Sequence, residues 1–461
     1  MRFPCLRCGS LILNYSKPSD VCTKYQEAAK IVNLALQGLV SQCVPGASVL
    51  DLCEFGHTVI QTQAQKLFTK KVDGRSIDRG VAFPVCISVN DVVCNFSPLP
   101  TDETVRSFFV SRSRPVSVTI KCETNVCCRF LFLNGNRYTV TLVQTLGKTA
   151  DPLLSWLHAL LEGASPTFLL QLQAPLKAGD VVKMDLGCHI DGYIAVAAHT
   201  CVVPAAADAP PTVEKEETGK VAVAAYNAML VAAAAISAGA KNTDVTAAVE
   251  RVAKAYGVTP IHSVRMHQMK RYVLDGVKEV ALKAPSPDDD MEEKLPECTF
   301  EQFEVYAVDV AMSTGDGNAR PGDLRTTIYK RNVEQQYSLK VQASRGLLAD
   351  VDKNFPTLPF TMRHLQDLRR ARLGLPECVS HGLLTPYPAL HDHSGVVAHF
   401  KCTVLLLPSG NTRVTGLDLP GYFTTTVEPD ADTAAVLKQL EEEAAKKAAR
   451  KAAKKNKKSK K

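Results

Sequence analysis

The sequence lacks the features that mark secreted, disulfide-rich and membrane proteins. Its fifteen cysteines are scattered over 461 residues without regular spacing, whereas disulfide scaffolds are usually short and dense in cysteine. The most hydrophobic long window, 222–240, is rich in alanine and contains Asn227 and Ser237, which favours a packed helix of a soluble protein over a transmembrane helix. The apolar stretch within residues 1–15 is too short for a signal peptide. We therefore expect reduced, mostly buried thiols and a protein of the cytoplasm or nucleus, without membrane insertion.

The cysteines give little sign of a metal site. Cys5 and Cys8 form one C-x-x-C motif, but no second cysteine pair and no histidine lies nearby. Structural zinc sites normally need four ligands. The motif is therefore a weak zinc signal, and the sequence predicts no metal and no other cofactor.

Acidic residues are absent from the C-terminal end. Residues 446–461 contain ten lysines or arginines and no acid, so the formal net charge of +7 leaves the rest of the chain at −3. A helical pattern begins at Thr433 and runs into the lysines. Because closely spaced lysines repel one another, we expect the tail, 431–461, to be helical and then disordered. Such a tail can contact RNA, or it can serve as a solubility segment or a nuclear-import signal.

The body of the chain alternates between helical and strand-like patterns. Thr23 followed by Gln26 fits a capping box at the start of a helix, and Asp191-Gly192 lies between two β-rich runs as a hairpin turn does. The predicted elements are helices over 23–43, 213–238 and 242–256, a hairpin over 180–203, strands over 80–98, 303–315 and 396–407, and a polar, basic segment over 325–385.

One strand contains a residue that needs an explanation. Lys401 lies within the apolar run VVAHFKCTVLLL, 396–407. Near-continuous apolar runs are typical of strands that are covered on both faces, and an unpaired buried ammonium is unfavourable. Lys401 therefore lies either on an edge, where its ammonium reaches water, or in the core beside carboxylates.

Three stretches together resemble a known family. They are GVAFPVCISVNDVVCNFSP at 80–98, LKAGDVVKMDLGCHIDGYIAVAAHT at 176–200, and FEVYAVDVAMSTGDG at 303–317 with RTTIYKR at 325–331. These stretches resemble the proliferation-associated proteins, known in animals as ErbB-receptor-binding proteins, which are a non-peptidase branch of the type 2 methionine aminopeptidases. The resemblance covers 16–103 and 175–430 and implies the α/β pita-bread fold, with 325–385 as a basic helical subdomain.

Residues 104–174 have no counterpart in that family, which has a short loop there. The segment contains Trp156, the only tryptophan, the pair Cys127-Cys128 and the hairpin signal Asn134-Gly135. It is either an inserted module or a translated intron in a faulty gene model. Residues 1–15 are an N-terminal extension, for which the same two explanations apply.

The resemblance implies that the metal site of the aminopeptidases is lost. The five metal-ligand positions of those enzymes fall on Asp185, Val196, His267, Asp309 and Lys401. A valine cannot coordinate a metal, and an ammonium repels a cation, whereas a pair of divalent ions needs several anionic ligands. We therefore interpret Asp185, His267 and Asp309 as partners of Lys401, with a single metal on these three residues as the alternative.

The two substrate-binding histidines of the enzymes are also absent. Their positions fall on Asn95 and Asp275. Peptidase catalysis of the enzyme type needs a base, a metal-bound water and orienting histidines together. The resemblance therefore implies a protein without peptidase activity.

The resemblance further implies binding to ribosomal RNA, structured messenger RNA and the large ribosomal subunit near its tunnel exit, with regulatory protein partners, in the cytoplasm and the nucleus or nucleolus. Two groups of cations support RNA contacts, because phosphate binding needs lysines and arginines. The first group is Arg325, Lys330, Arg331, Lys340, Arg345, Arg363, Arg369, Arg370 and Arg372, which could instead be an exposed helix face. The second group is Lys446, Lys447, Arg450, Lys451, Lys454, Lys455, Lys457, Lys458, Lys460 and Lys461.

Two other functions stay open at this stage. The chain could be an adaptor that binds peptides in the emptied pocket, although Asn95 and Asp275 do not favour it, or a residual metallo-aminopeptidase. A stoichiometric pair of divalent ions in the purified protein would support the enzyme. A pull-down with and without RNase would separate partners bridged by RNA from partners bound directly.

Overall fold

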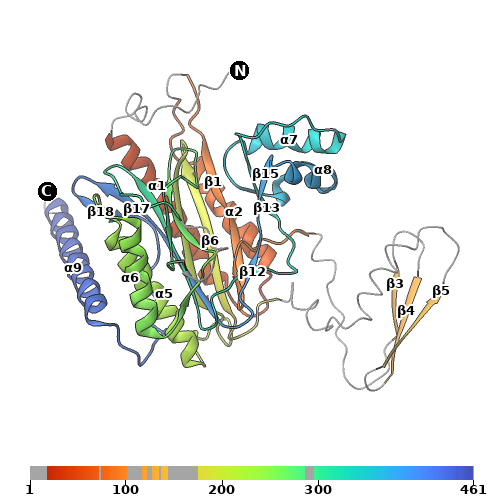
Figure 1. Ribbon diagram of the computed structural model, residues 1–461, viewed down its shortest axis with the longest axis horizontal. Coiled ribbons are helices and arrows are strands. Elements are labelled where there is room, and N and C mark those ends of the chain that lie inside the picture. The colour runs from red at the N-terminus through yellow and green to blue at the C-terminus, as the bar shows by residue number, and fades with distance from the viewer. Residues whose placement is uncertain are drawn as a thin grey trace. The chain divides into compact units, whose positions relative to one another are not determined.

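The chain divides into two compact units. The computed structural model describes residues 18–71, 74–100, 117–121, 127–133, 137–143, 175–285 and 295–459 (Figure 1). One unit comprises Met1–Leu99 with Pro175–Lys461, and the other comprises Pro100–Ala174. The second unit lies close to the bounds expected for the inserted segment. Its described residues form the antiparallel sheet β3-β4-β5, with β3 at Ser117–Lys121, β4 at Cys127–Leu133 and β5 at Arg137–Val143. Trp156, Cys5 and Cys8 lie outside the described residues.

The larger unit is built around one antiparallel sheet. Its strand order is β1-β6-β7-β17-β11-β9-β10, and β18 and β8 pair with β17 and β11. The strands are β1 Arg79–Val89, β6 Val181–Ile190, β7 Tyr193–Val202, β8 Thr259–Pro260, β9 Arg265–Met269, β10 Glu279–Ala281, β11 Val305–Ser313, β17 Val397–Leu407 and β18 Gly410–Arg413. The predicted hairpin is thus confirmed as β6 and β7, and the strand with Lys401 pairs on both sides.

Four helices cover one face of this sheet. They are α1 Pro18–Gln42, α2 Val49–Gln65, α5 Glu216–Ala235 and α6 Asn242–Tyr256. Ser48 caps α2 by accepting a hydrogen bond from the Asp51 amide, and Gly257 ends α6 with φ of +61°, a conformation that glycine adopts without strain. Helices α1 and α2 pack on β6 and β7, and α5 and α6 pack on β11 and β17 (Figure 1).

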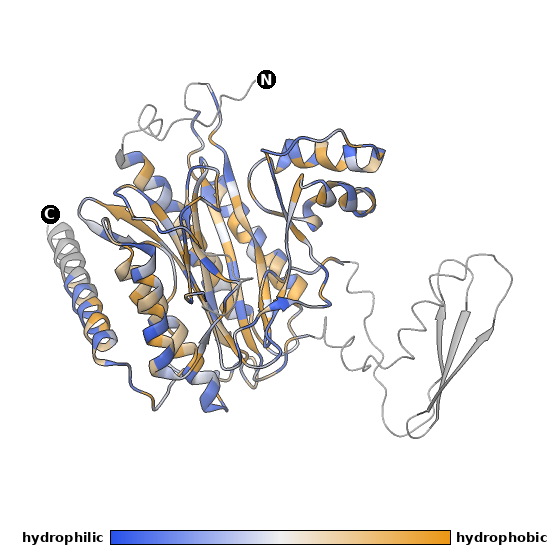
Figure 2. Cartoon of the chain, viewed as in Figure 1, coloured by the Kyte–Doolittle hydropathy of each residue, from blue (hydrophilic) through white to orange (hydrophobic). Residues whose placement is uncertain are grey.

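Alternation along the strands separates the two faces of the sheet. Successive side chains of a strand point to opposite faces. In β17 the even-numbered residues from Phe400 to Leu406 pack with α5 and α6, so His399, Lys401 and Thr403 face away from the helices. Figure 2 shows hydrophobic residues along these central strands.

A smaller layer covers the opposite face. Its sheet β14-β13-β15 consists of Phe360–Thr361, Ile328–Arg331 and Leu384–Tyr387, and it carries α7 (Gln342–Asn354) and α8 (Leu368–Ser380). Ile328 and Leu358 pack with Phe83 and Leu405 of the large sheet. The 325–385 segment, expected to be helical, is therefore a mixed α/β layer that closes over the inner face. A third sheet joins β12 (Arg320–Pro321), β16 (Leu390–His391) and β2 (Val92–Cys94).

The apolar helix identified in the sequence is part of the core. α5 is long and apolar enough to cross a membrane by length and composition, but 67% of its most apolar window is buried inside the fold. Its alanines and valines pack against α6, β11 and β17. The apolar character of α5 is therefore explained by tertiary packing. Ten cysteines of the described residues are free thiols, and most of them are buried.

The C-terminal helix is longer than expected. α9 spans Ala431–Ser459, so the helix continues through a segment that the lysine repulsion predicted to be disordered. Alanine pairs alternate with lysine pairs along this segment, and both residue types are strong helix formers. Residues 460 and 461 lie outside the described residues.

The division into two units predicts that the smaller one can be removed. Leu99 is buried among residues of α7 and α8, and Leu176 forms backbone hydrogen bonds with Gly46 and Ala47, so the larger unit holds both junctions by itself. We expect a variant that joins Asp102 to Pro175 through a short polar linker to be soluble and to unfold cooperatively, because loop length changes loop entropy only slowly. Circular dichroism during thermal unfolding checks this, and a loss of all soluble protein would contradict it.

Candidate functional site

The inner face of the large sheet carries a row of four residues on four neighbouring strands. Asp185 of β6 pairs with Ala198 of β7, Ala198 pairs with Lys401 of β17, and Lys401 pairs with Asp309 of β11. Neighbouring strands are about 4.8 Å apart, so Lys401 lies directly beside Asp309 and two strands from Asp185. The methyl group of Ala198 leaves space for the lysine side chain to extend to Asp185.

Lys401 bridges the two carboxylates of this row. Its Nζ lies 2.6 Å from Asp185 Oδ2 and 2.8 Å from Asp309 Oδ2. The ring of Phe83 lies on the same ammonium, with its centroid 5.5 Å from Nζ, which is within the range of a cation–π contact. The prediction that Lys401 pairs with Asp185 or Asp309 is confirmed, since it pairs with both.

The bridge is buried, and this determines its charge state. Lys401 is 8% exposed. Burial alone lowers the pKa of an ammonium, but the carboxylates of Asp185 and Asp309 outweigh it and raise the pKa of Lys401. Burial likewise raises the pKa of Asp309, and the charges of Lys401 and His399 reverse this and lower it. The lysine is therefore protonated and the Asp309 carboxylate is ionised at neutral pH.

His399 is a fourth titratable member of the site, beside Asp185, Asp309 and Lys401, and it was not predicted from the sequence. It lies two residues before Lys401 on the same strand, and its Nε2 lies 2.5 Å from Asp309 Oδ1. Thr200 fixes its backbone, because the Thr200 hydroxyl donates to the His399 carbonyl and accepts from the His399 amide. The sequence shows that His399 and Lys401 are two residues apart on one strand and therefore face the same side. It does not show that β11 lies next to that strand and places Asp309 beside His399. Each oxygen of Asp309 thus has its own partner.

Comparison with known proteins identifies the family of the chain. Residues 158–292 match the metallopeptidase family M24. The chain is 40% identical over 419 residues to ErbB-3 binding protein 1 of Solanum tuberosum, with 89% of this chain and 86% of the relative covered. It is 31% identical over 400 residues to the curved DNA-binding protein of Schizosaccharomyces pombe, with coverage of 86% and 83%.

The chain belongs to the ErbB-3 binding protein family. This is the proliferation-associated family that the three sequence stretches resemble, so the resemblance is confirmed. A solved structure of a thermophilic Arx1 superposes with a TM-score of 0.68 at 23% identity and covers 92% of this chain and 98% of its own. The likeness confirms the expected α/β pita-bread fold.

The other two positions that the resemblance assigns to metal ligands, 196 and 267, do not join the Lys401 bridge. Val196 is buried on β7 and lies opposite Gly187, where an added Cβ would lie 2.9 Å from Val196 Cγ1. His267 contacts Asp275 rather than Lys401, with 3.9 Å between Nε2 and Oδ1. The interpretation of His267 as a partner of Lys401 was therefore wrong, because β9 lies beyond β11 at the edge of the row.

The two substrate positions have other partners. The Asn95 side chain donates to the Pro388 carbonyl at 3.1 Å. Asp275 accepts from Lys330 at 2.6 Å and from the Tyr387 hydroxyl. Burial raises the pKa of Asp275, but His267 and Lys330 outweigh burial and lower it. Both side chains are thus engaged in contacts within the fold.

Several of the expected RNA-binding arginines and lysines have structural roles. Lys330 pairs with Asp275, Arg331 pairs with Asp352 at 2.9 Å, and Arg363 pairs with Glu54 at 2.6 Å. Arg363 also donates to Ser97 and Pro98, and its side chain is only 2% exposed. Lys330 and Arg363 thus tie the small layer to the rest of the fold, and Arg331 ties β13 to α7 within that layer. Their assignment to RNA stays a prediction. The sequence alone does not show which basic residues form ion pairs within the fold and which lie free at the surface.

Other cations of the first group lie at the surface. Arg325, Arg369, Arg370, Lys340 and Arg345 are exposed, and Arg372 is half-buried. Arg345 donates to the carbonyls of Leu339 and Lys340. In the tail, Lys446 is exposed and lies 3.7 Å from Glu442 one turn earlier. The side chains of Lys447, Arg450, Lys451, Lys454, Lys455, Lys457, Lys458, Lys460 and Lys461 lie outside the described residues.

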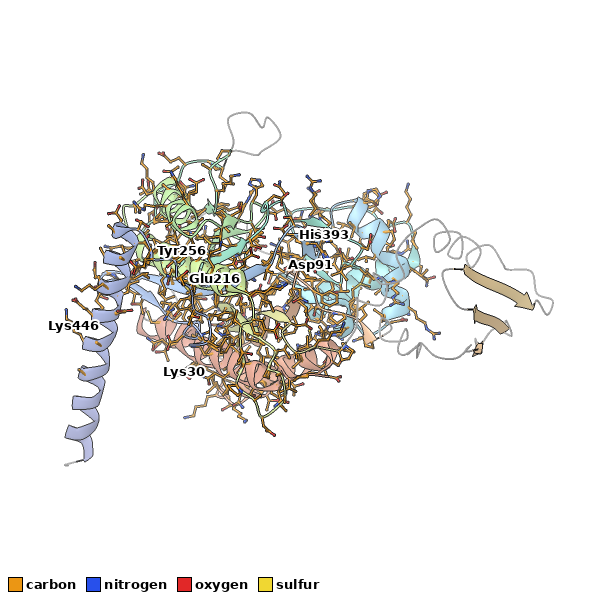
Figure 3. The ribbon with its side chains drawn as sticks, turned by 90° about the horizontal axis from the view of Figure 1, so that it is seen from below. Lys30, Asp91, Glu216, Tyr256, His393 and Lys446 are labelled. Atoms are coloured by element: carbon orange, nitrogen blue, oxygen red, sulfur yellow. The ribbon has the colours of Figure 1, made fainter. Side chains whose placement is uncertain are left out.

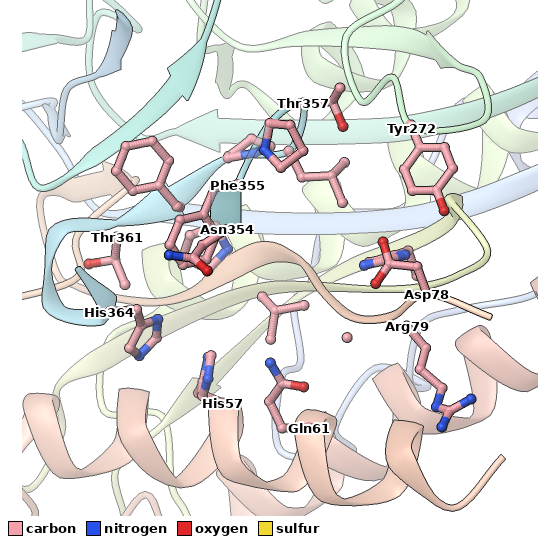
Figure 4. Close-up of a pocket in the computed structure, with 18 residues that line it drawn as sticks. His57, Gln61, Asp78, Arg79, Tyr272, Asn354, Phe355, Thr357, Thr361 and His364 are labelled. Carbon is pink, nitrogen blue, oxygen red and sulfur yellow. The ribbon is translucent and has the colours of Figure 1, made fainter. Parts of the chain in front are cut away.

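A small cavity lies between α2 and the loop after α7. Its volume is about 160 Å³, and its lining includes His57, Gln61, Tyr272, Asn354 and His364 (Figure 4). None of the five metal-ligand positions lines this cavity. Burial and the neighbouring His364 lower the pKa of His57 to about 4, so this imidazole is neutral at physiological pH.

The Lys401 bridge predicts a specific pattern of stabilities. Lys401→Met leaves two buried carboxylates without their cation, which costs about 3–5 kcal/mol when one partner of a buried pair is removed. Adding Asp185→Asn and Asp309→Asn should recover part of this loss, since no uncompensated charge remains. Urea unfolding at pH 7 measures both. Equal midpoints for Lys401→Met and the unmodified protein would contradict the bridge.

The same bridge predicts a pH dependence. Asp309 has a lowered pKa in the folded protein, so its contribution is present above the unfolded value of about 3.9 and is lost as pH falls. Lys401 has a raised pKa, so its contribution is lost only as pH rises above about 10.4. We expect the stability difference between the unmodified protein and Lys401→Met to be full from about pH 7 to 9 and to shrink as pH falls, because the uncompensated buried carboxylates of the variant take up protons first. A difference that stays constant down to about pH 2 would argue against an ionised Asp309.

Proposed function

We propose that this chain is a catalytically inactive member of the aminopeptidase fold that binds RNA and the large ribosomal subunit, and thereby regulates ribosome biogenesis, translation and growth. Its expected location is the cytoplasm and the nucleus, including the nucleolus. The Lys401 bridge between Asp185 and Asp309 is the observation that carries the loss of catalysis. The RNA and ribosome half rests on the family resemblance and on the exposed cations.

The residues at the five ligand positions do not fit a pair of metal ions. Such a pair stabilises a hydrolytic reaction when several anionic ligands offset its charge and a bridging water is activated. Here the Lys401 ammonium lies within 2.8 Å of both carboxylates, so the anionic oxygens already have a cation. Val196 offers no ligand atom, and His267 contacts Asp275. We therefore derive no hydrolytic step at this site.

The proposal that the chain binds RNA is supported by its exposed cations and by the name of one relative. Arg369 and Arg370 are exposed on α8, and Arg325 is exposed at the start of the same layer. Together with the ten cations of 446–461, they can contact phosphates along two separate stretches of RNA. The relative from Schizosaccharomyces pombe is named a curved DNA-binding protein, which supports nucleic-acid binding by this kind of chain. Contacts to the phosphate backbone of RNA position a protein on the RNA but do not distinguish one base sequence from another.

A peptide-binding adaptor is the second candidate function. The cavity beside His57 and His364 is about 160 Å³, whereas pockets for drug-sized ligands are roughly 300–1,000 Å³. The side chains at the former substrate positions, Asn95 and Asp275, already contact Pro388, Lys330 and Tyr387. These observations count against peptide capture in this cavity or at the former substrate positions.

The first experiment measures peptidase activity. We expect no release of methionine from a Met-Ala peptide with cobalt, manganese or zinc added. The double variant Val196→Asp with Lys401→Glu should bind divalent metal more tightly than the unmodified protein and still show little turnover, because Asn95 and Asp275 supply no imidazole. Turnover by the unmodified protein above a metal-free control would overturn the loss of catalysis.

The second experiment measures the salt dependence of binding to ribosomes and to structured RNA. Truncation after Glu443 removes ten cations, so binding should weaken and the slope of log K against log salt should become shallower. Arg369→Glu with Arg370→Glu should instead abolish docking at one site on the ribosome and leave loose RNA affinity.

The matched control is Lys70→Glu with Lys71→Glu, which makes the same charge change at two exposed residues after α2. This control should retain ribosome docking. If the truncated chain bound ribosomes with unchanged affinity and slope, the tail would be only a solubility or import segment. If the control lost docking as fully as the arginine variant, α8 would have no specific role.

A further inference from the structure

A cluster outside the aminopeptidase site brings together two histidines and an aspartate from distant parts of the chain. Asp91 lies in the turn between β1 and β2, and His391 and His393 lie in and after β16. β16 pairs with β2 so that His391 is opposite Val92, and the Asp392 amide donates to the Asp91 carbonyl at 2.9 Å. These backbone contacts fix the turn against the 391–393 segment. Figure 3 shows Asp91 and His393 next to each other.

Both imidazoles point to the same carboxylate oxygen. His391 Nδ1 lies 3.2 Å from Asp91 Oδ2, and His393 Nδ1 lies 3.1 Å from it. Asp392, between the two histidines, is held away from them, because its Oδ1 accepts hydrogen bonds from the amide and the hydroxyl of Ser394. The two imidazole rings stack, with centroids 5.2 Å apart and planes inclined by 23°.

The spacing matches the coordination shell of a transition metal. The three ligand atoms all lie within 4.8 Å of one another. In a tetrahedral zinc site with bonds of about 2.0–2.1 Å, ligand atoms are about 3.4 Å apart. Two of the three separations in the cluster are therefore already within a few tenths of an ångström of that value. Only a small movement would bring all three atoms onto one ion.

We propose that Asp91, His391 and His393 bind one divalent transition-metal ion, with zinc as the ion that fits best. Two imidazole nitrogens and one carboxylate oxygen suit zinc, whereas magnesium and calcium prefer oxygen ligands alone. The His393 side chain is 60% exposed, so the fourth position faces solvent and accepts water or a further ligand. This site is separate from the five positions of the aminopeptidase site, and the proposal does not depend on the proposed function.

Packing prepares the buried half of this site. The His391 side chain is 7% exposed, and Gly322 lies against its ring, where an added Cβ would be 2.7 Å from Cδ2. The ring is thus held with Nδ1 toward Asp91 before a metal binds. Within the described residues, His391 Nε2 has no hydrogen-bond partner, so contacts with Gly322 and the stacked His393 ring orient the imidazole. A bound metal would tie the β1–β2 turn to β16.

Zinc titration of chelator-treated, full-length protein tests the proposal. We expect one equivalent of zinc to bind and to raise the midpoint of thermal unfolding, because an ion that binds only the folded state stabilises it. His393→Ala should weaken zinc binding by at least about tenfold, because even the loss of a residue that only supports a metal ligand lowers metal affinity by about 10–100-fold. Because His393 is exposed, the thermal midpoint of this variant without metal should stay close to that of the unmodified protein.

Two further variants and one spectrum make the result specific. Asp91→Asn keeps an acceptor oxygen but removes the charge, and it should also weaken zinc binding. His381→Ala removes an exposed histidine elsewhere and should leave binding unchanged. Fifteen cysteines are possible competing ligands, so cobalt is used in place of zinc, and the proposed site should give no thiolate-to-cobalt charge-transfer absorption.

Three outcomes would overturn the proposal. The first is that the unmodified protein binds no stoichiometric zinc, which would leave the cluster as a set of histidine–aspartate hydrogen bonds. The second is zinc binding that His393→Ala does not weaken. The third is zinc binding that only Asp185→Asn abolishes, which would place the ion in the aminopeptidase site and count against the proposed loss of catalysis as well.

Discussion

The inner face of the protein depends on one ammonium between two carboxylates. Asp185 and Asp309 come from strands that are separated by two others, and both side chains are buried. Two carboxylates buried this close to one another need a cation between them. Lys401 is that cation, and its stem fits because Ala198, the residue it crosses, has only a methyl side chain. The charge of the site is thus balanced by the protein itself.

This balance explains why the rest of the site is arranged as it is. His399 contacts the Asp309 oxygen that Lys401 leaves available, and Phe83 lies against the ammonium. The layer of β13, β14 and β15 closes over the row and removes it from water. Lys330 and Arg363 hold that layer against the rest of the fold through ion pairs with Asp275 and Glu54. A closed, charge-balanced site of this kind agrees with the proposed loss of catalysis.

The features of this fold that depend on the order of residues within a short segment could be predicted from the sequence. The hairpin of β6 and β7 follows from two β-rich runs around Asp191-Gly192, and a charged residue in the apolar run of β17 required buried partners. Strand register determines the other parts. The pairing of His399 with Asp309, the position of His267 beyond β11, and the contact of Asp91 with residues 300 positions later all depend on which strands are neighbours. The helix α9 continues to Ser459 instead of ending in a disordered segment, because the helix propensity of the alanine and lysine pairs outweighs the repulsion between the lysines.

A crystal structure of the protein soaked in manganese tests the central claim most directly, since manganese is visible by anomalous scattering. The account predicts no anomalous peak between Asp185 and Asp309, and density for the Lys401 side chain that ends between the two carboxylates. A strong peak coordinated by Asp185 and Asp309, with Lys401 turned away from them, would contradict it.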